Sequence, residues 1–191
     1  MGRIIGWLRM KERRILLWAN SKPLNKTINR WVCRWLSTIT HMGGATFTLS
    51  TAALTALAAP APWRTTGVQC LVAVIVSHLP VAFVKRTIKR LRPYQALQGV
   101  RTYKSPLVDS SFPSGHTTAV FAWLLPILLT TIREAPAALP VVVPACLVIG
   151  LSVAWSRMFL GLHYPSDVAA GAVLGSLTAL AACTFMPLPS S

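Results

Sequence analysis

The chain has 191 residues, of which 53% are hydrophobic and only 12% are charged. A soluble domain carries about twice that share of charged residues, and 19 Lys and Arg stand against 4 Asp and Glu. Because long apolar blocks alternate with basic stretches, the composition excludes an ordinary soluble domain and argues against a nucleic-acid binder. The four cysteines are far apart and form no C-x-x-C pair, which argues against a zinc site or a disulfide framework.

Residues 1–42 form a basic arm ahead of the apolar blocks. Its second half has apolar residues at the i, i+3, i+4 and i+7 spacing of one helical face, namely Ile28, Trp31, Val32, Trp35, Leu36 and Ile39. Arg30 and Arg34 lie on the other face. A helix of this kind is expected to lie in the membrane interface. The alternative is a helix docked on the rest of the protein.

Five apolar segments follow, each near the ~20 residues that a helix needs to cross a bilayer. We predict spans at 45–62, 66–84, 117–132, 138–156 and 168–186. The last contains Gly171 and Gly175, whose spacing allows close approach of another helix. The fold class is therefore all-α: an integral membrane bundle of about five transmembrane helices over 43–187, preceded by amphipathic interfacial helices and followed by a short tail at 188–191.

Counting these spans puts three polar segments on one side of the membrane: Lys85–Pro93, Pro113–His116 and Ser156–Asp167. The arm lies on that side too, so 17 of the 19 basic residues share it. The positive-inside rule then predicts a multi-pass cell-membrane protein with this side in the cytoplasm. The alternative is that the basic residues only gather anionic lipid headgroups.

In the first segment, Lys85 and Arg92 are two helical turns apart, so they share a face if the helix continues to Pro93. A cationic pair at fixed spacing suits a phosphate group. Basic residues at the end of a span are also typical cytoplasmic anchors, and this alternative stays open for the segment taken alone.

The second segment, Pro113-Ser114-Gly115-His116, leads directly into a span. Ser114 can cap the helix, and Gly115 lets its backbone approach a ligand closely. The free N–H groups of a helix start bind anions, and His116 beside them can carry a proton. Asp109, shortly before, is interpreted as an acceptor near this helix start.

The third segment adds a cation, Arg157, and a histidine–carboxylate pair, His163 and Asp167, four residues apart. A carboxylate at this spacing can accept the imidazole N–H and hold its tautomer. The other ring nitrogen is then free to act as a nucleophile.

In this order, K-x6-R-P, P-S-G-H and S-R-x5-H resemble the signature of the type 2 phosphatidic acid phosphatase family, which includes vanadium haloperoxidases. The ten matching positions are Lys85, Arg92, Pro93, Pro113, Ser114, Gly115, His116, Ser156, Arg157 and His163, with Asp167 as partner of the last. The resemblance covers roughly residues 45–186 and leaves the arm outside.

The resemblance implies that His163 attacks phosphorus to form a phosphohistidine, with Asp167 orienting it. His116 would protonate the leaving oxygen and then activate water. The phosphoryl oxygens would be held by Lys85, Arg92, Ser114, Gly115 and Arg157. Three cations and a helix start would neutralise the charge, so no metal or cofactor is expected.

The expected function is hydrolysis of a membrane lipid phosphate or isoprenoid diphosphate, with undecaprenyl diphosphate or phosphatidylglycerophosphate as substrate examples. The expected partners are this lipid and the bilayer, with no nucleic acid. Phosphoryl transfer to an acceptor other than water and a catalytically idle lipid-binding protein are the alternatives. The apolar spans argue against a soluble haloperoxidase.

Overall fold

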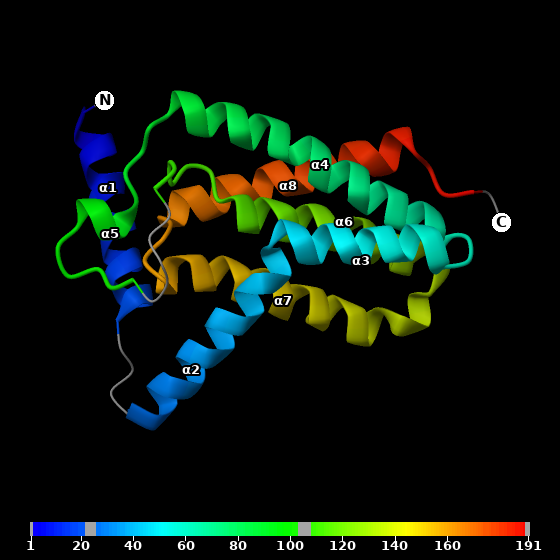
Figure 1. The fold of residues 1–191 in the computed structure, drawn as a ribbon, viewed down its shortest axis with the longest axis horizontal. Coiled ribbons are helices and arrows are strands. Elements are labelled where there is room, and N and C mark those ends of the chain that lie inside the picture. Colours follow the sequence, from blue (N-terminus) through cyan, green and yellow to red (C-terminus); the bar gives the residue numbers. More distant parts are fainter. Residues whose placement is uncertain (1, 22–25, 103–107, 190–191) are drawn as a thin grey trace.

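A computed structural model describes residues 2–21, 26–102 and 108–189, so parts of the arm and of the C-terminal tail lie outside the described residues. Within these ranges every regular element is a helix (Figure 1). They are α1 (Gly2–Asn20), α2 (Lys26–Ile39), the 3-10 helix η1 (Thr40–Gly43), α3 (Ala45–Ala58), α4 (Trp63–Thr87), α5 (Pro93–Ala96), α6 (Gly115–Glu134), the 3-10 helix η2 (Pro136–Ala138), α7 (Leu139–Phe159) and α8 (Pro165–Phe185). The all-helical prediction is confirmed.

Four of the five predicted spans are helices long and apolar enough to cross a membrane: α4, α6, α7 together with η2, and α8. The first predicted span is shorter than expected. Its helix, α3, has 14 residues, or about 21 Å at 1.5 Å per residue, against about 30 Å of hydrocarbon. Pro60 and Pro62 follow its end and cannot extend the hydrogen-bond ladder. In Figure 1, α3 begins near the middle of the bundle and runs along only half of it.

The distribution of side chains is that of a membrane protein. Large apolar residues on the long helices face outward, with exposed fractions of 67% for Leu79, 68% for Phe83 and 60% for Leu151. Polar groups lie inside, where Thr66 and Thr130 hydrogen-bond to each other at 2.7 Å. Buried hydroxyls that pair across helices satisfy groups that lipid cannot.

α8 packs closely on α6 through the two glycines that the sequence singled out. A Cβ atom at Gly171 would lie 2.7 Å from the carbonyl oxygen of Ser114, and one at Gly175 would clash with that of Thr118. The close-approach prediction is therefore confirmed within one chain. This packing sets the starts of α6 and α8 side by side.

The apolar face predicted for residues 28–39 divides in two. Leu36 and Ile39 are buried against α6 and α7, as the docked alternative requires. Trp31 and Trp35 are 66% and 55% exposed, as the interfacial placement requires. That placement, and the boundaries of the arm, stay predictions.

Candidate active site

Four helix ends meet at one end of the bundle: the C-terminal ends of α4 and α7 and the N-terminal ends of α6 and α8 (Figure 1). The backbone N–H of Ser114 donates to the carbonyl of Asp167 at 3.0 Å. Arg92 donates to the carbonyl of Leu162 at 3.0 Å. The structure thus brings together the three segments that topology counting placed on one side.

Lys85 and Arg92 share one carboxylate, that of Asp109. Lys85 Nζ lies 2.6 Å from Oδ2 and Arg92 Nη2 lies 2.6 Å from Oδ1. Burial raises the pKa of Asp109, but the hydrogen bonds and charges of the two cations outweigh it and lower the pKa to about 2. An ionised carboxylate therefore lies between the two cations, instead of capping a helix start as the sequence suggested.

Arg157 is buried in the last turn of α7, with 2% of its surface exposed. Its Nη1 donates to the Thr40 hydroxyl of η1 at 3.0 Å. Its Nε is buried and has no hydrogen-bond partner within the described ranges. Leaving such a donor unsatisfied is costly, and a phosphoryl oxygen would satisfy it. The arm thus contributes Thr40 to the site.

The P-S-G-H segment forms the start of α6, as expected. Ser114 is the N-cap residue, and its buried side chain accepts from the Thr117 N–H at 3.4 Å. A Cβ atom at Gly115 would meet no atom within 4 Å, so the space beside this glycine is open. His116, in the first turn, is partly exposed. An open, positively polarised helix start is suited to an anion.

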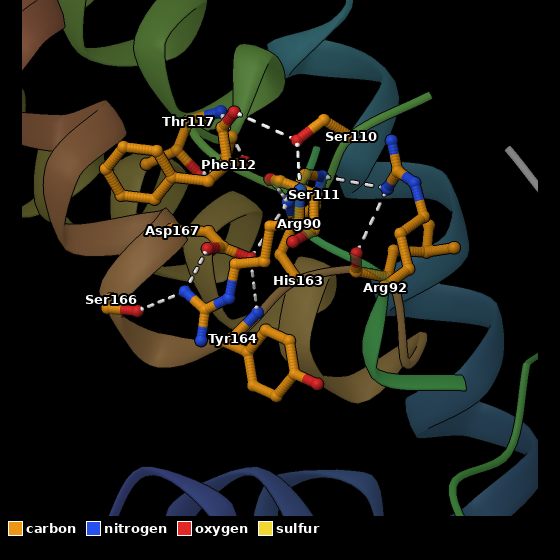
Figure 2. Close-up of polar contacts among 12 residues, drawn as sticks. Arg90, Arg92, Ser110, Ser111, Phe112, Thr117, His163, Tyr164, Ser166 and Asp167 are labelled. Atoms are coloured by element: carbon orange, nitrogen blue, oxygen red, sulfur yellow. Dashed lines mark hydrogen bonds and ion pairs between the residues drawn. The ribbon is translucent and has the colours of Figure 1, made fainter. Parts of the chain in front are cut away.

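His163 is buried between Arg92 and the backbone of Ser111 (Figure 2). Its Nδ1 lies 2.6 Å from the Ser111 carbonyl oxygen, and Arg92 Nη1 lies 3.2 Å from its Nε2. A carbonyl only accepts and a guanidinium only donates, so the proton is on Nδ1 and the lone pair is on Nε2. Burial, together with the charges of Arg157, Arg92 and Lys85, lowers the pKa of His163 well below its usual value. The imidazole is therefore neutral at pH 7.

Asp167 does not take the His163 N–H directly, because its Oδ2 lies 3.6 Å from Nδ1. The carboxylate is fully buried and binds other groups at shorter range. Oδ2 accepts from the Tyr164 N–H at 2.8 Å, and Oδ1 pairs with Arg90 Nη1 at 2.7 Å (Figure 2). Asp167 thus acts on His163 as a nearby negative charge rather than through a hydrogen bond.

Sequence reasoning did not single out Thr40, Arg90, Ser111 or Glu12, whose carboxylate pairs with Arg90 at 2.8 Å. Arg90 lies in the same basic run as Lys85 and Arg92, and nothing in its spacing marks it. Ser111 acts through its backbone carbonyl, which carries no residue signal. Only the scarcity of acidic residues in a basic chain could have drawn attention to Glu12.

The chemistry of the side chains is that of an anion site. Within the described ranges, no three His, Cys, Asp or Glu side chains gather as a metal site. The positive charge around His163 comes from Lys85, Arg92 and Arg157. That these cations suffice without a metal remains a prediction.

Known proteins resemble parts of this sequence, and solved structures resemble its fold. One relative is decaprenylphosphoryl-5-phosphoribose phosphatase of Mycobacterium tuberculosis, to which the chain is 35% identical over 101 residues. The match covers 53% of this chain and 50% of that protein. The chain is 27% identical over 113 residues, 59% of its length, to undecaprenyl-diphosphatase of Sulfolobus acidocaldarius, covering 52% of that protein. The chain spans about half the length of the curated relatives it matches.

Among solved structures, the chain resembles a transmembrane PAP2 type phosphatidylglycerolphosphate phosphatase from Bacillus subtilis. The TM-score is 0.75 at 23% identity, over 93% of this chain and 85% of the other. The sequence pattern of the PAP2 superfamily matches residues 66–189. Because this match covers more than half of the chain and includes every motif residue described above, the protein belongs to the PAP2 superfamily.

Proposed function

We propose that the protein is a metal-independent lipid phosphatase that works through a phosphohistidine on His163. The observation that carries this proposal is the state of His163: a buried, neutral imidazole whose Nε2 lone pair lies among three cations. A neutral imidazole is nucleophilic, and the cations stabilise the charge that builds on a phosphoryl group in the transition state.

In the first step, Nε2 of His163 forms a bond to phosphorus while the bond to the leaving oxygen breaks. His116 gives its proton to that oxygen. The imidazole gains a positive charge, which the Ser111 carbonyl and the Asp167 carboxylate stabilise. Arg92, which donates to Nε2 in the structure, turns to a phosphoryl oxygen.

In the second step, neutral His116 takes a proton from water, and the hydroxide oxygen attacks phosphorus. The phosphorus–nitrogen bond breaks, its electron pair returns to Nε2, and phosphate leaves. Arg157 binds a phosphoryl oxygen in both steps through its Nε, which has no partner among the described residues. The N–H groups of the α6 start, Gly115 among them, bind the others.

The substrate we propose is a lipid phosphate or isoprenoid diphosphate, such as undecaprenyl diphosphate or phosphatidylglycerophosphate. The site lies at the end of a bundle whose outer surface is apolar, so a lipid in the bilayer can reach it with its phosphate at the interface. The names of the relatives, a polyprenyl diphosphatase and a polyprenylphosphoryl-sugar phosphatase, support a polyprenyl chain. Phosphate release from a panel of purified lipids identifies the substrate, and product analysis with added alcohols detects transfer to other acceptors.

The mechanism is tested with His163→Ala in detergent. We expect turnover to be lost and no phosphoenzyme to form, while wild type labels with 32P on histidine. His78→Ala is the control, because this α4 histidine bonds only to its own helix in the structure, at Val74 (2.7 Å). Near-normal hydrolysis by His163→Ala would exclude the mechanism.

We further propose that the active-site end faces the cytoplasm. Apart from the three motif cations, 14 Lys and Arg lie on that side by sequence, against Arg64 and Arg133 on the other. In a chain without its native cysteines, Gln98→Cys and Ala137→Cys place one exposed thiol at each end. An impermeant reagent applied to intact cells should label only Ala137→Cys; labelling of only Gln98→Cys reverses the orientation.

A further inference from the structure

α1 crosses the active-site end of the bundle (Figure 1) and turns one face toward it. That face consists of Glu12, Leu16, Ala19 and Asn20, of which the last three are buried. Their spacing of four, three and one residues places them on one side of a helix. Asn20 fixes the helix to the bundle, because its side-chain amide donates to the Phe159 carbonyl at 2.6 Å and to that of Arg101 at 2.9 Å.

Because α1 is docked in this way, the carboxylate of Glu12 points toward Arg90. Oε2 lies 2.8 Å from Arg90 Nη2, and Oε1 accepts from both the N–H and the hydroxyl of Ser166. Nη1 of the same guanidinium lies 2.7 Å from Asp167 Oδ1 and donates to the Ser166 hydroxyl, also at 2.7 Å (Figure 2). The ring of Tyr164 lies under the guanidinium, with its centroid 4.0 Å from Cζ. Arg90 is therefore held by Glu12, Asp167, Ser166 and the Tyr164 ring.

These contacts determine which carboxylate oxygen of Asp167 binds Arg90. With Nη2 bound to Glu12 and Nη1 shared between Oδ1 and the Ser166 hydroxyl, the guanidinium binds only Oδ1 of the carboxylate, and Oδ2 remains with the Tyr164 N–H beside Nδ1 of His163. A guanidinium released from Glu12 is free to bind both oxygens of the carboxylate, as Arg prefers. It would then withdraw Oδ2 from His163 and add uncompensated positive charge next to the imidazole.

From these contacts we infer that Glu12 is a positioning residue for the proposed reaction: through Arg90 it holds Asp167 so that Oδ2 faces His163. This inference rests on the proposed function. It extends the active site to a helix outside the matched residues 66–189.

The distribution of acidic residues supports this role. The chain has only 4 Asp and Glu, and three of them, Glu12, Asp109 and Asp167, bind cations at this end of the bundle. Glu12 is the one acid in the sequence of α1, where Lys11, Arg13 and Arg14 surround it. Those three cations are exposed, whereas Glu12 is turned to the bundle.

The test uses the full-length wild type, Glu12→Gln, Glu12→Asp and, as a charge control on the exposed face of α1, Arg13→Gln. On a lipid substrate of the wild type, we expect Glu12→Gln to lower kcat and the rate of phosphoenzyme formation roughly tenfold, the size expected when a coupled ion-pair network loses one partner. KM should stay within about twofold, because Glu12 is not among the residues proposed to hold the phosphate. Glu12→Asp should recover part of kcat, and Arg13→Gln should behave as wild type.

Three results would overturn the inference. If Glu12→Gln leaves kcat unchanged and lowers the thermal midpoint, Glu12 only stabilises the packing of α1 on the bundle. A raised KM with unchanged kcat would give α1 a part in lipid capture instead. A wild type that releases no phosphate from any lipid would refute the proposed function and this inference with it, whereas the first two results leave the proposed function intact.

Discussion

Asp109 lies between Lys85 and Arg92, the two cations proposed to hold the phosphate group, so it should compete with the substrate. Both ion pairs measure 2.6 Å, and the Asp109 side chain is 52% exposed. The carboxylate is half exposed while Arg92 is only 1% exposed, so solvent reaches both pairs from the Asp109 side. Ion pairs screened by solvent are worth about 0.2–1 kcal/mol each. Two of them amount to about 1 kcal/mol of competition, or roughly a fivefold change in affinity.

The informative change is Asp109→Asn, which removes the charge and keeps the shape. We expect the inhibition constant of inorganic phosphate to fall roughly fivefold, with a smaller gain at high salt because screening weakens the pairs. Since the pKa of Asp109 is about 2, the carboxylate stays ionised, and with sulfate, an inhibitor of constant charge, the gain should be the same at every pH from 5 to 9. Asp109→Glu, which keeps the charge, is the control.

The opposite result has a definite meaning. Weaker phosphate binding by Asp109→Asn would show that the carboxylate holds the two cations in place for the substrate instead of competing with it. A gain that disappears as the pH falls from 7 to 5 would show that the group titrates near neutrality, in conflict with the two short ion pairs.

Two other variants test the remaining parts of the site. Arg157→Lys keeps a charge but loses the Nε donor, so we expect kcat/KM to fall roughly 10- to 100-fold, as for one charged hydrogen bond; a fall of less than twofold in steady-state assays would mean that Nε does not bind substrate. The lowered pKa of His163 makes the unfolded state bind more protons below pH 6.5, so folding stability should drop as the pH falls from about 7 toward 5, by at most about 1.4 kcal/mol per pH unit. Denaturant titrations of His163→Gln should lack this part of the slope, and identical slopes for both proteins would contradict it.

Residues that act through side chains near their own span ends were predictable from the sequence. Span counting placed Lys85, Arg157 and His163 at one end of the bundle because each follows or precedes an apolar block. The two glycines of α8 were recognisable as a packing surface for the same reason: a helix has a fixed period, and position along it determines direction.

The remaining features depend on tertiary contacts that no local pattern encodes. Glu12 meets Arg90 from 78 positions away, and Ser111 contributes only a carbonyl group. The short length of α3 could have been predicted from the sequence, since Pro60 and Pro62 mark its end. Toward the active-site end, the chain before α3 forms η1, which packs on α6 and α7. Gly43 permits this packing, because a Cβ atom there would lie 2.7 Å from the carbonyl oxygen of His116.

The charges at the active-site end differ in how permanently they are neutralised. Asp167 is fully buried and bound on both oxygens, so its charge stays in place throughout a reaction. Asp109 is half exposed, and hydration of its carboxylate makes its displacement inexpensive.

Arg157 has a hydroxyl but no carboxylate within hydrogen-bond reach among the described residues. On the proposed mechanism, a phosphate group that enters the site replaces the negative charge of Asp109 and supplies the one that Arg157 lacks, while the charge beside His163 is unchanged. If the proposed mechanism holds, binding and nucleophile activation use separate carboxylates, so substitutions at Asp109 should act on KM and substitutions in the Glu12–Arg90–Asp167 network on kcat.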